Sequence, residues 1–305
     1  FPPWCRVPNS LQALSMNYQS GIGKRHMHSY EHINVKPMTV NVGSEISGVD
    51  LRQPSPHAAS EIRRALIDRK VLVFRDQELT PDQYKDFMQI FGTPVKEDMD
   101  VDAGHPLEVG AIHIRPDERQ RINFWHMDHS FRDLPTPVLA LYARLLPPVG
   151  GDTLFTSLEA AYDGLSKRMK SAVEGLTCYH RVTTTQNTKR RHTKEEAETM
   201  AKAPPVVHPL VCLNPDNGRR FLFVNVPIYC RSIVEMPTAE GDALLKKLYQ
   251  HVQRTVFHVR VVWQENTVVI WENVHCLHYP VADYFPHERK LWRVVIDATD
   301  RPKAA

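Results

Sequence analysis

The spacing of apolar residues in the first hundred positions predicts short strands and two amphipathic helices. The segments HAASEIRRALIDR (57–69) and TPDQYKDFMQIFG (80–92) repeat their apolar residues at the helical period. Thr80 has the side chain and the position expected of an N-cap for the second helix. Between the helices, KVLVFRD (70–76) is a continuous apolar run that predicts a buried strand, and residues 33–51 predict short strands broken by turns.

Strands outnumber helices in the rest of the chain. After a loop rich in acids and proline (93–123), strands are predicted at 137–148, 219–225, 255–263, 267–273 and 289–297, and helices at 157–176 and 238–253. Because the link 264–266 is tight, we expect the strands on either side of it to form a hairpin. Many strands with helices outside them favour an α+β, mostly β fold with a double-stranded β-helix (jelly roll) core. No glycine-rich phosphate loop follows a strand, so a dinucleotide-binding or P-loop fold has no support.

Composition excludes several classes of partner. The 305 residues are 42% hydrophobic and 24% charged, with a net charge of only +3, and no basic stripe or membrane-length apolar run is present. We therefore expect no nucleic-acid partner and no membrane partner. The chain starts FPPWCRVPNS, without a secretory pattern and without an initiator Met, so a preceding segment stays open. Five widely spaced cysteines without a C-x-x-C pair indicate reduced thiols and a cytoplasmic location, and argue against a zinc ribbon. The oligomeric state stays open, with a homo-oligomer among the options.

The stretch FWHMDHSF (124–131) carries the first candidate chemistry. On an extended strand His126 and Asp128 would point to the same face, and an imidazole and a carboxylate that converge suit a divalent metal. A histidine that is simply paired with a neighbouring acid is the alternative. A third ligand could come from WENVHCLHYP, in which either His275 or His278 would complete a two-histidine, one-carboxylate face.

The last predicted strand adds two candidate anion-binding side chains. Arg289 and Arg293 are four residues apart, so both should point into the same cavity. Burying two guanidinium groups is costly unless acids or anionic ligands balance them. Surface ion pairs with acids such as Asp283 or Glu288 are the alternative.

Taken in order, these motifs resemble those of the TauD/TfdA family of Fe(II)- and 2-oxoglutarate-dependent oxygenases. The resemblance extends from ISGVDL to the last strand and rests on the order of FWHMD, PPVGGDTLF, GRRFLFVN, IWENVHCLHYPVADY and the two arginines. It implies residues 31–300 as a single jelly-roll oxygenase domain after an irregular segment 1–30, with insertions or lids near 93–123 and 183–205.

The resemblance also implies roles for individual residues. His126, Asp128 and His278 match the iron ligands, which leaves His275 to packing. Thr153 and Arg289 match the pair that binds the far carboxylate of 2-oxoglutarate, and Arg293 matches the arginine that binds the anionic group of the substrate. The implied reaction uses O₂ and releases succinate and CO₂. It hydroxylates an unactivated C–H bond, with desaturation or ring closure as other outcomes. Family members serve sulfonate, sulfate-ester and aryloxyacid catabolism and secondary metabolism.

The sequence departs from the taurine enzymes in the loop after FG. FGTPVKEDMDV places Glu97, Asp98 and Asp100 there, and Ile122 replaces an asparagine, so the sulfonate pocket is not reproduced. One hypothesis is that Arg293 holds a carboxylate while Glu97 or Asp100 holds an ammonium, which would make an amino acid or another zwitterion the substrate. Exposure of these acids to solvent is the alternative.

Aromatic and aliphatic side chains are expected to line the substrate pocket. The expected wall consists of Phe124, Phe131, Ile228 and Tyr229. Two other functions remain alternatives: a zinc-dependent hydrolase built on the same triad, and a non-catalytic jelly-roll binding protein. The hydrolase gives no reason for Thr153 and the two arginines, and the binding protein predicts damage to the triad or to these three residues, whereas all six positions are intact.

Overall fold

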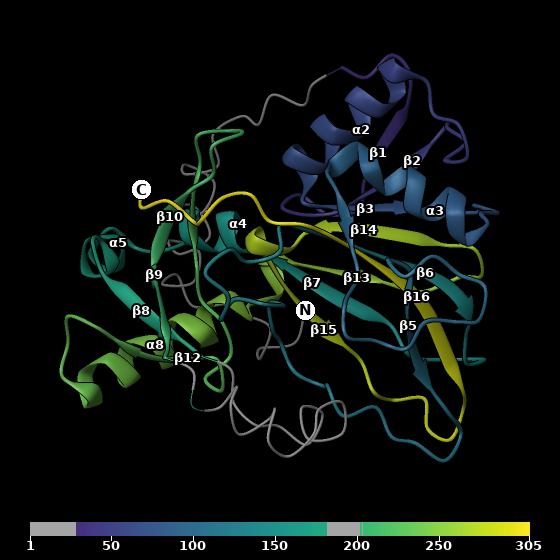
Figure 1. The fold of residues 1–305 in the computed structure, drawn as a ribbon. Helices are drawn as coiled ribbons and strands as arrows, with labels where there is room; N and C mark the ends of the chain where they lie inside the picture. Colours follow the sequence, from purple (N-terminus) through teal and green to yellow (C-terminus); the bar gives the residue numbers. More distant parts are fainter. Residues whose placement is uncertain (1–28, 182–201, 203) are drawn as a thin grey trace, which may run out of the picture.

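A large sheet forms the centre of the computed structural model, which describes residues 29–181, 202 and 204–305 (Figure 1). The sheet has eight strands. Seven of them follow the order β1-β2-β3-β14-β6-β16-β4, and the eighth, β5, also pairs with β16. The strands are β1 (Asn34–Pro37), β2 (Ser44–Ser47), β3 (Val71–Phe74), β4 (Pro94–Val95), β5 (Gly110–Ile114), β6 (Val138–Leu145), β14 (Val268–Glu272) and β16 (Arg289–Ile296). Only β2 and β3 pair in parallel, since the other pairs in this sheet are antiparallel.

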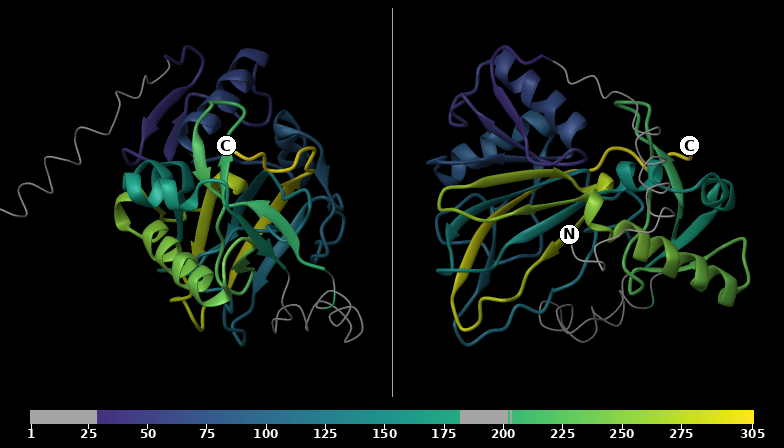
Figure 2. Two further views of the ribbon diagram at one scale, coloured as in Figure 1. Left: turned by 90° about the vertical axis from the view of Figure 1, so that its left-hand side faces the viewer. Right: turned by 180° about the vertical axis from the view of Figure 1, so that it is seen from behind.

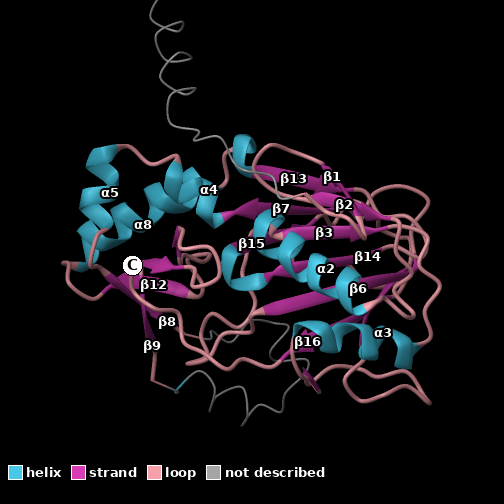
Figure 3. Cartoon of the chain, turned by 90° about the horizontal axis from the view of Figure 1, so that it is seen from above, coloured by secondary structure: helices cyan, strands magenta, loops and turns pink. Residues whose placement is uncertain are grey.

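Helices α2 (Pro56–Arg69) and α3 (Pro81–Met88) cover one face of this sheet, as the view from above shows (Figure 3). Ile62 of α2 and Phe87 of α3 join a buried apolar cluster with Ile270 and Val294 of the strands. Thr80 caps α3 through a capping box, as the sequence predicts.

The opposite face packs against a three-stranded sheet in the order β13-β7-β15. These strands are β7 (Thr153–Ser157), β13 (His258–Val261) and β15 (Cys276–Pro280). Phe155 and Val259 from this sheet share a buried cluster with Val269, Trp271 and Val295 from the large sheet. Both faces of the large sheet are therefore buried, which explains why its central strands are continuous apolar runs.

A smaller lobe lies next to the two facing sheets, at one end of the molecule (Figure 2). It contains the helices α4 (Leu158–Asp163), α5 (Lys167–Val173) and α8 (Thr238–Val252), and the strands β8 (Thr177–His180), β9 (Val206–Pro209), β10 (Val211–Leu213), β11 (Arg220–Leu222) and β12 (Cys230–Ile233). Strands β12-β8-β9 form one sheet and β10-β11 a hairpin, and both pack with the helices around Phe223 and Leu248.

Three local predictions are wrong. The segments 255–263 and 267–273 do not form a hairpin: β13 pairs with β7 in one sheet, and β14 lies between β3 and β6 in the other. The link between them carries the chain from one sheet to the other. The loop predicted at 93–123 contains β4 and β5, whose partner β16 is about 175 to 200 residues away in the sequence.

The third wrong prediction is the single helix at 157–176, which is two short helices. Gly164 ends α4 where a Cβ atom would lie 2.7 Å from the ring of Phe257, and Ser166 caps the start of α5. The predicted segment 1–30 and the insertion at 183–205 fall largely outside the described residues. Within the described residues, no helix has the length and apolar character needed to cross a bilayer.

Candidate active site

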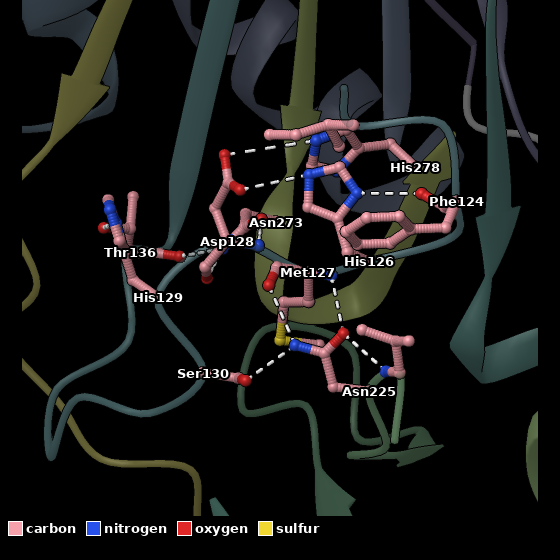
Figure 4. Close-up of polar contacts among 12 residues, drawn as sticks. Phe124, His126, Met127, Asp128, His129, Ser130, Thr136, Asn225, Asn273 and His278 are labelled. Carbon is pink, nitrogen blue, oxygen red and sulfur yellow. Dashed lines mark hydrogen bonds and ion pairs between the residues drawn. The ribbon is translucent and has the colours of Figure 1, made fainter. Parts of the chain in front are cut away.

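His126, Asp128 and His278 converge at the open end of the two facing sheets (Figure 4). Asp128 Oδ1 lies 3.4 Å from His126 Nε2, and Asp128 Oδ2 lies 4.0 Å from His278 Nε2. His126 is not part of a strand, contrary to expectation. It forms a single bridge with His278 of β15, closed by reciprocal backbone N–H···O bonds of 2.9 and 2.8 Å. The structure therefore brings the two predicted sequence motifs together as neighbouring backbone.

The surroundings of the three side chains suit the binding of a divalent metal. Nδ1 of His126 lies 3.0 Å from the carbonyl oxygen of Phe124, so a proton on Nδ1 leaves the Nε2 lone pair free for a metal. Burial and the nearby His126 lower the pKa of His278 well below its usual value. Burial opposes ionisation of Asp128, but Arg293 and the histidines outweigh it and lower the pKa of that carboxyl well below its usual range. A carboxylate and two neutral imidazoles within 4.8 Å of one another fit Fe(II) with open coordination positions.

Two buried asparagines hold the backbone that carries the first two ligands (Figure 4). Asn225, just after β11, accepts a hydrogen bond from Met127 N (3.0 Å) and donates one to Met127 O (2.9 Å). Asn273, just after β14, accepts one from Asp128 N (3.1 Å) and donates to Asp128 O (2.9 Å) and Thr136 O (2.8 Å). Asn225 ends the motif FLFVN and Asn273 ends the motif WEN, but the sequence alone gave neither asparagine a role.

His275 lies outside the triad. Its Nδ1 is 3.0 Å from Glu272 Oε2, and its ring packs edge-on against Phe221. Glu272 also binds Lys70 Nζ at 2.7 Å, and Glu159 binds the same ammonium at 2.9 Å. Of the two histidines left open by spacing, His278 is the one whose ring faces Asp128.

Arg289 is a buried cation with unused hydrogen-bonding capacity. It is 3% exposed, and within the described part of the chain its Nε and Nη2 have no hydrogen-bond partner. Burial lowers the pKa of its guanidinium, whose carbon lies 5.7 Å from the ring centre of Trp263 and 5.8 Å from that of Tyr284. Such a group needs an anion, and the far carboxylate of 2-oxoglutarate fits it.

Thr153 lies beside Arg289 in the wall of the same cavity. Trp263 Nε1 donates to Thr153 Oγ1 at 3.1 Å, which leaves the hydroxyl proton of Thr153 available to a ligand. The chain approaches Arg289 closely at Gly151, where φ is +71° and a Cβ atom would lie 3.2 Å from Arg289 Cδ and Nε. Trp263 and Gly151 are site residues that the sequence did not indicate.

The suggested surface partners of Arg289 are engaged elsewhere. Asp283 accepts a hydrogen bond from the backbone N–H of Gly151 at 2.8 Å, and Glu288 lies 2.5 Å from His113 Nε2. The surface ion-pair explanation therefore does not account for this arginine.

Arg293 is paired with two carboxylates at once. Its Nη1 donates to Asp128 Oδ2 at 2.7 Å, and its Nε donates to Glu97 Oε2 at 2.6 Å. His129 Nε2 lies 3.2 Å from Glu97 Oε1 while its Nδ1 lies 2.8 Å from Thr136 Oγ1. Burial lowers the pKa of His129 to about 4, so the ring is neutral at pH 7 and can donate from Nε2 to Glu97. The contact between Arg293 and the metal-ligand candidate Asp128 was not expected from the sequence.

A cavity of about 1150 Å³ opens onto the triad, Thr153 and Glu97. It is lined by both arginines and by the apolar residues expected in its wall, Phe124, Phe131, Ile228 and Tyr229. Asp98 and Asp100 also line it but are exposed, so of the three acids in this loop Glu97 is the one that contacts Arg293.

Comparison with known proteins gives an independent line of evidence. Residues 34–295 match the family model described as taurine catabolism dioxygenase TauD, TfdA family. The chain is 31% identical over 264 residues to the alpha-ketoglutarate-dependent 2,4-dichlorophenoxyacetate dioxygenase of Cupriavidus pinatubonensis, covering 76% of this chain and 86% of the relative. A crystal structure of a taurine dioxygenase from Burkholderia xenovorans superposes with a TM-score of 0.76 at 32% identity, covering 89% of this chain and 93% of that one.

A second solved structure bears on the ligands. AAD-2 in complex with Mn(II) and N-oxalylglycine superposes with a TM-score of 0.74 at 27% identity, covering 89% of this chain and all of the other. The match spans nearly the whole described chain, which carries a triad suited to iron and, at Arg289, two buried guanidinium nitrogens with no partner among the described residues. The chain belongs to the TauD/TfdA family and is a non-haem iron dioxygenase that uses Fe(II), 2-oxoglutarate and O₂.

Proposed function

We propose that His126, Asp128 and His278 hold Fe(II), and that Arg289 and Thr153 bind the far carboxylate of 2-oxoglutarate. The buried guanidinium of Arg289 carries this proposal: its Nε and Nη2 have no hydrogen-bond partner among the described residues, and a zinc hydrolase or an inert binding protein gives no reason to bury it. The iron centre, with 2-oxoglutarate and O₂, supplies the oxidation of an unactivated C–H bond with release of succinate and CO₂.

The chain's own residues do the positioning. Asn225 and Asn273 fix the backbone of the first two ligands, and Arg293 holds one oxygen of Asp128. The Trp263 indole N–H donates to Thr153 Oγ1, so the hydroxyl proton of Thr153 can be donated to a ligand carboxylate in the cavity. Burial of this corner excludes water, which strengthens the pairing of Arg289 with a carboxylate.

The substrate we propose is a small anion that binds beside Arg293. In this structure the carboxylate of Glu97 lies on Arg293 Nε and Nη2, where the carboxylate or sulfonate of a substrate could bind instead. Phe124, whose ring centre is 5.5 Å from that of His126, forms the apolar wall close to the triad.

A zwitterionic amino acid is the specific candidate that the Glu97–Arg293 pair favours. Its carboxylate would take the guanidinium while Glu97, released from that contact, would take the ammonium, with Asp100 at the exposed mouth of the cavity. Hydroxylation is the expected outcome, with desaturation or ring closure as alternatives.

We further infer that residues 31–300 form one domain of jelly-roll type. The support is the pair of sheets that face each other across the cluster containing Phe155 and Trp271. The cytoplasmic location and a homo-oligomeric state stay predictions, which subcellular fractionation and light scattering can test.

The first test is anaerobic addition of Fe(II) and 2-oxoglutarate to the metal-free protein. A weak metal-to-ligand charge-transfer band should appear only when both are present, and should be missing in His126→Ala. Succinate release is then measured across sulfonates, aryloxyacids, carboxylates and amino acids. Glu97→Gln should lower turnover of amino acids at least tenfold relative to simple anions, whereas equal turnover of both classes would remove the zwitterion proposal. A folded protein that binds iron but gives no band would contradict the assigned 2-oxoglutarate site.

A further inference from the structure

A second cluster of metal-ligand side chains lies inside the smaller lobe, away from the triad. Cys178 and His180 are two apart on β8 and so share a face, and Cys230 on β12 is the cross-strand partner of His180. Their ligand atoms all lie within 4.8 Å of one another, and all three residues are buried. On the other side of β8, His208 of β9 is the cross-strand partner of Cys178. One face of this three-stranded sheet therefore carries two cysteines and two histidines.

Three of the four ring nitrogens of these two histidines have no hydrogen-bond partner among the described residues. Both ring nitrogens of His180, which is 0% exposed, lack a hydrogen-bond partner within the described residues, and so does Nδ1 of His208. Nε2 of His208 lies 3.0 Å from the carbonyl oxygen of Arg132. A proton on that Nε2 places the lone pair on Nδ1, which is the arrangement found when a histidine binds metal through its other nitrogen.

The two sulfur atoms also lie close together. The Sγ atoms of Cys178 and Cys230 are 2.7 Å apart. A simple disulfide between the cysteines would leave His180 and His208 unexplained. Thiolates together with imidazoles select zinc over magnesium or calcium.

We propose that Cys178, His180, Cys230 and His208 form a structural zinc site. Two thiolates and two neutral imidazoles close a tetrahedral Cys₂His₂ shell and balance the 2+ charge, and the thiol protons pass to solvent on binding. The Sγ atoms must separate by about 1 Å to reach zinc at ~2.3 Å with tetrahedral angles. Phe223, whose ring centre is 5.2 Å from that of His180 and 5.0 Å from that of His208, seals the site from water.

The site would brace one wall of the catalytic cavity. His208 binds the carbonyl of Arg132, in the loop that follows Asp128, and Cys230 follows the cavity residue Tyr229 directly. Zinc would therefore fix the positions of Phe131 and Tyr229, whose rings lie 5.9 Å apart, without taking part in the reaction.

The test separates this site from the iron triad. The full chain carrying His126→Ala and Asp128→Ala is purified from zinc-supplemented medium without chelator, and its metal content is measured by mass spectrometry. We expect one zinc ion per chain, lost when Cys178→Ser is added and kept when Cys212→Ser is added. Cys212 is a suitable control because it is equally buried but lies outside the cluster. Absence of zinc from the folded parent variant would overturn the proposal.

Cobalt substitution gives a second readout that does not depend on a cysteine variant folding. Co(II) bound to Cys178 and Cys230 should give a thiolate-to-metal charge-transfer band in the near ultraviolet, which the triad cannot produce because it contains no sulfur. No such band, or a Cys178–Cys230 disulfide found by peptide mapping of protein purified without oxidant, would overturn the zinc site.

Discussion

Asn273 offers the sharpest test of how the fold holds the proposed iron ligands. Its side chain is fully buried and makes three hydrogen bonds, two of them to the backbone N–H and C=O of Asp128. Asn273→Ala removes all three and leaves the backbone of a metal-ligand candidate without fixed partners. At about 1 kcal/mol per hydrogen bond, we expect the free energy of unfolding to fall by about 3 kcal/mol.

The effect on the metal should be separable from the effect on stability. Loss of groups that orient metal ligands commonly lowers affinity by about 10- to 100-fold, so we expect Fe(II) affinity in Asn273→Ala to fall within that range. Affinity is measured by anaerobic titration of the charge-transfer band at saturating 2-oxoglutarate, and stability by urea unfolding of the metal-free protein. Succinate production should recover largely when Fe(II) is raised, because the three ligands themselves remain.

Asn214→Ala is the matched control. Asn214 is also fully buried, and it binds Glu159 Oε1 at 2.8 Å and the N–H of Asp216 at 3.0 Å, so its loss should destabilise the fold to a similar extent. It touches no residue of the triad, and its Fe(II) affinity should match the wild type. If the two variants lose stability alike and Asn273→Ala still binds Fe(II) within about twofold of wild type, the positioning role is refuted.

Three further outcomes follow from buried charges and their partners. Arg289→Leu should raise the KM for 2-oxoglutarate at least tenfold, with Arg289→Lys intermediate, and an unchanged KM in a steady-state succinate assay would contradict its assignment. Trp263→Phe should raise the same KM several-fold with little change in kcat, because Thr153 loses the donor that orients it. Lys70→Met should cost about 3–5 kcal/mol in urea unfolding, because it removes the buried ammonium that the carboxylates of Glu159 and Glu272 share. Burial alone would raise the pKa of Glu272, but Lys70 and His275 outweigh burial and lower that pKa to about 2. In the wild type, this carboxylate therefore stabilises the fold above pH 4.5, and its contribution is lost as the pH falls from 4.5 toward 2. In Lys70→Met the sign should reverse, with stability rising as the pH falls from 7 to 5, and parallel pH profiles for the two proteins would count against the ion-pair account.

The sequence predicted local geometry well along the last strand, where strict alternation determines which side chains share a face. Alternation along 289–297 placed Leu291 and Val295 on one face and Val294 and Ile296 on the other, and they indeed join different apolar clusters. The same alternation placed Arg289 and Arg293 in one cavity. It did not predict strand partners, since pairing between β13 and β7 is decided by packing across a hundred residues and not by the length of the link before β14.

Residues with metal-binding or charged side chains could be picked out of the sequence as site candidates. Residues whose role depends only on what they contact in the fold could not. His126 and Asp128 stood out because their chemistry is unusual in an apolar setting, and the family resemblance favoured His278 over His275 as the third candidate. Asn225 and Asn273 did not stand out, although each directly follows an apolar strand run, and that placement was the available signal. Cys-x-His at Cys178 and His180 was a comparable signal, but its partners on other strands are visible only once the sheet has formed.

The contacts of Arg293 show why the metal site and the substrate site cannot be assigned to separate residues. One guanidinium donates to Asp128 through Nη1 and to Glu97 through Nε and Nη2, so it holds a metal-ligand candidate and faces the cavity at the same time. This dual role depends on a planar group with donors along two edges, which an ammonium lacks. A substrate anion that displaces Glu97 would meet an arginine whose orientation Asp128 already fixes. The position of the Asp128 side chain and the shape of the proposed substrate pocket would therefore depend on the same arginine.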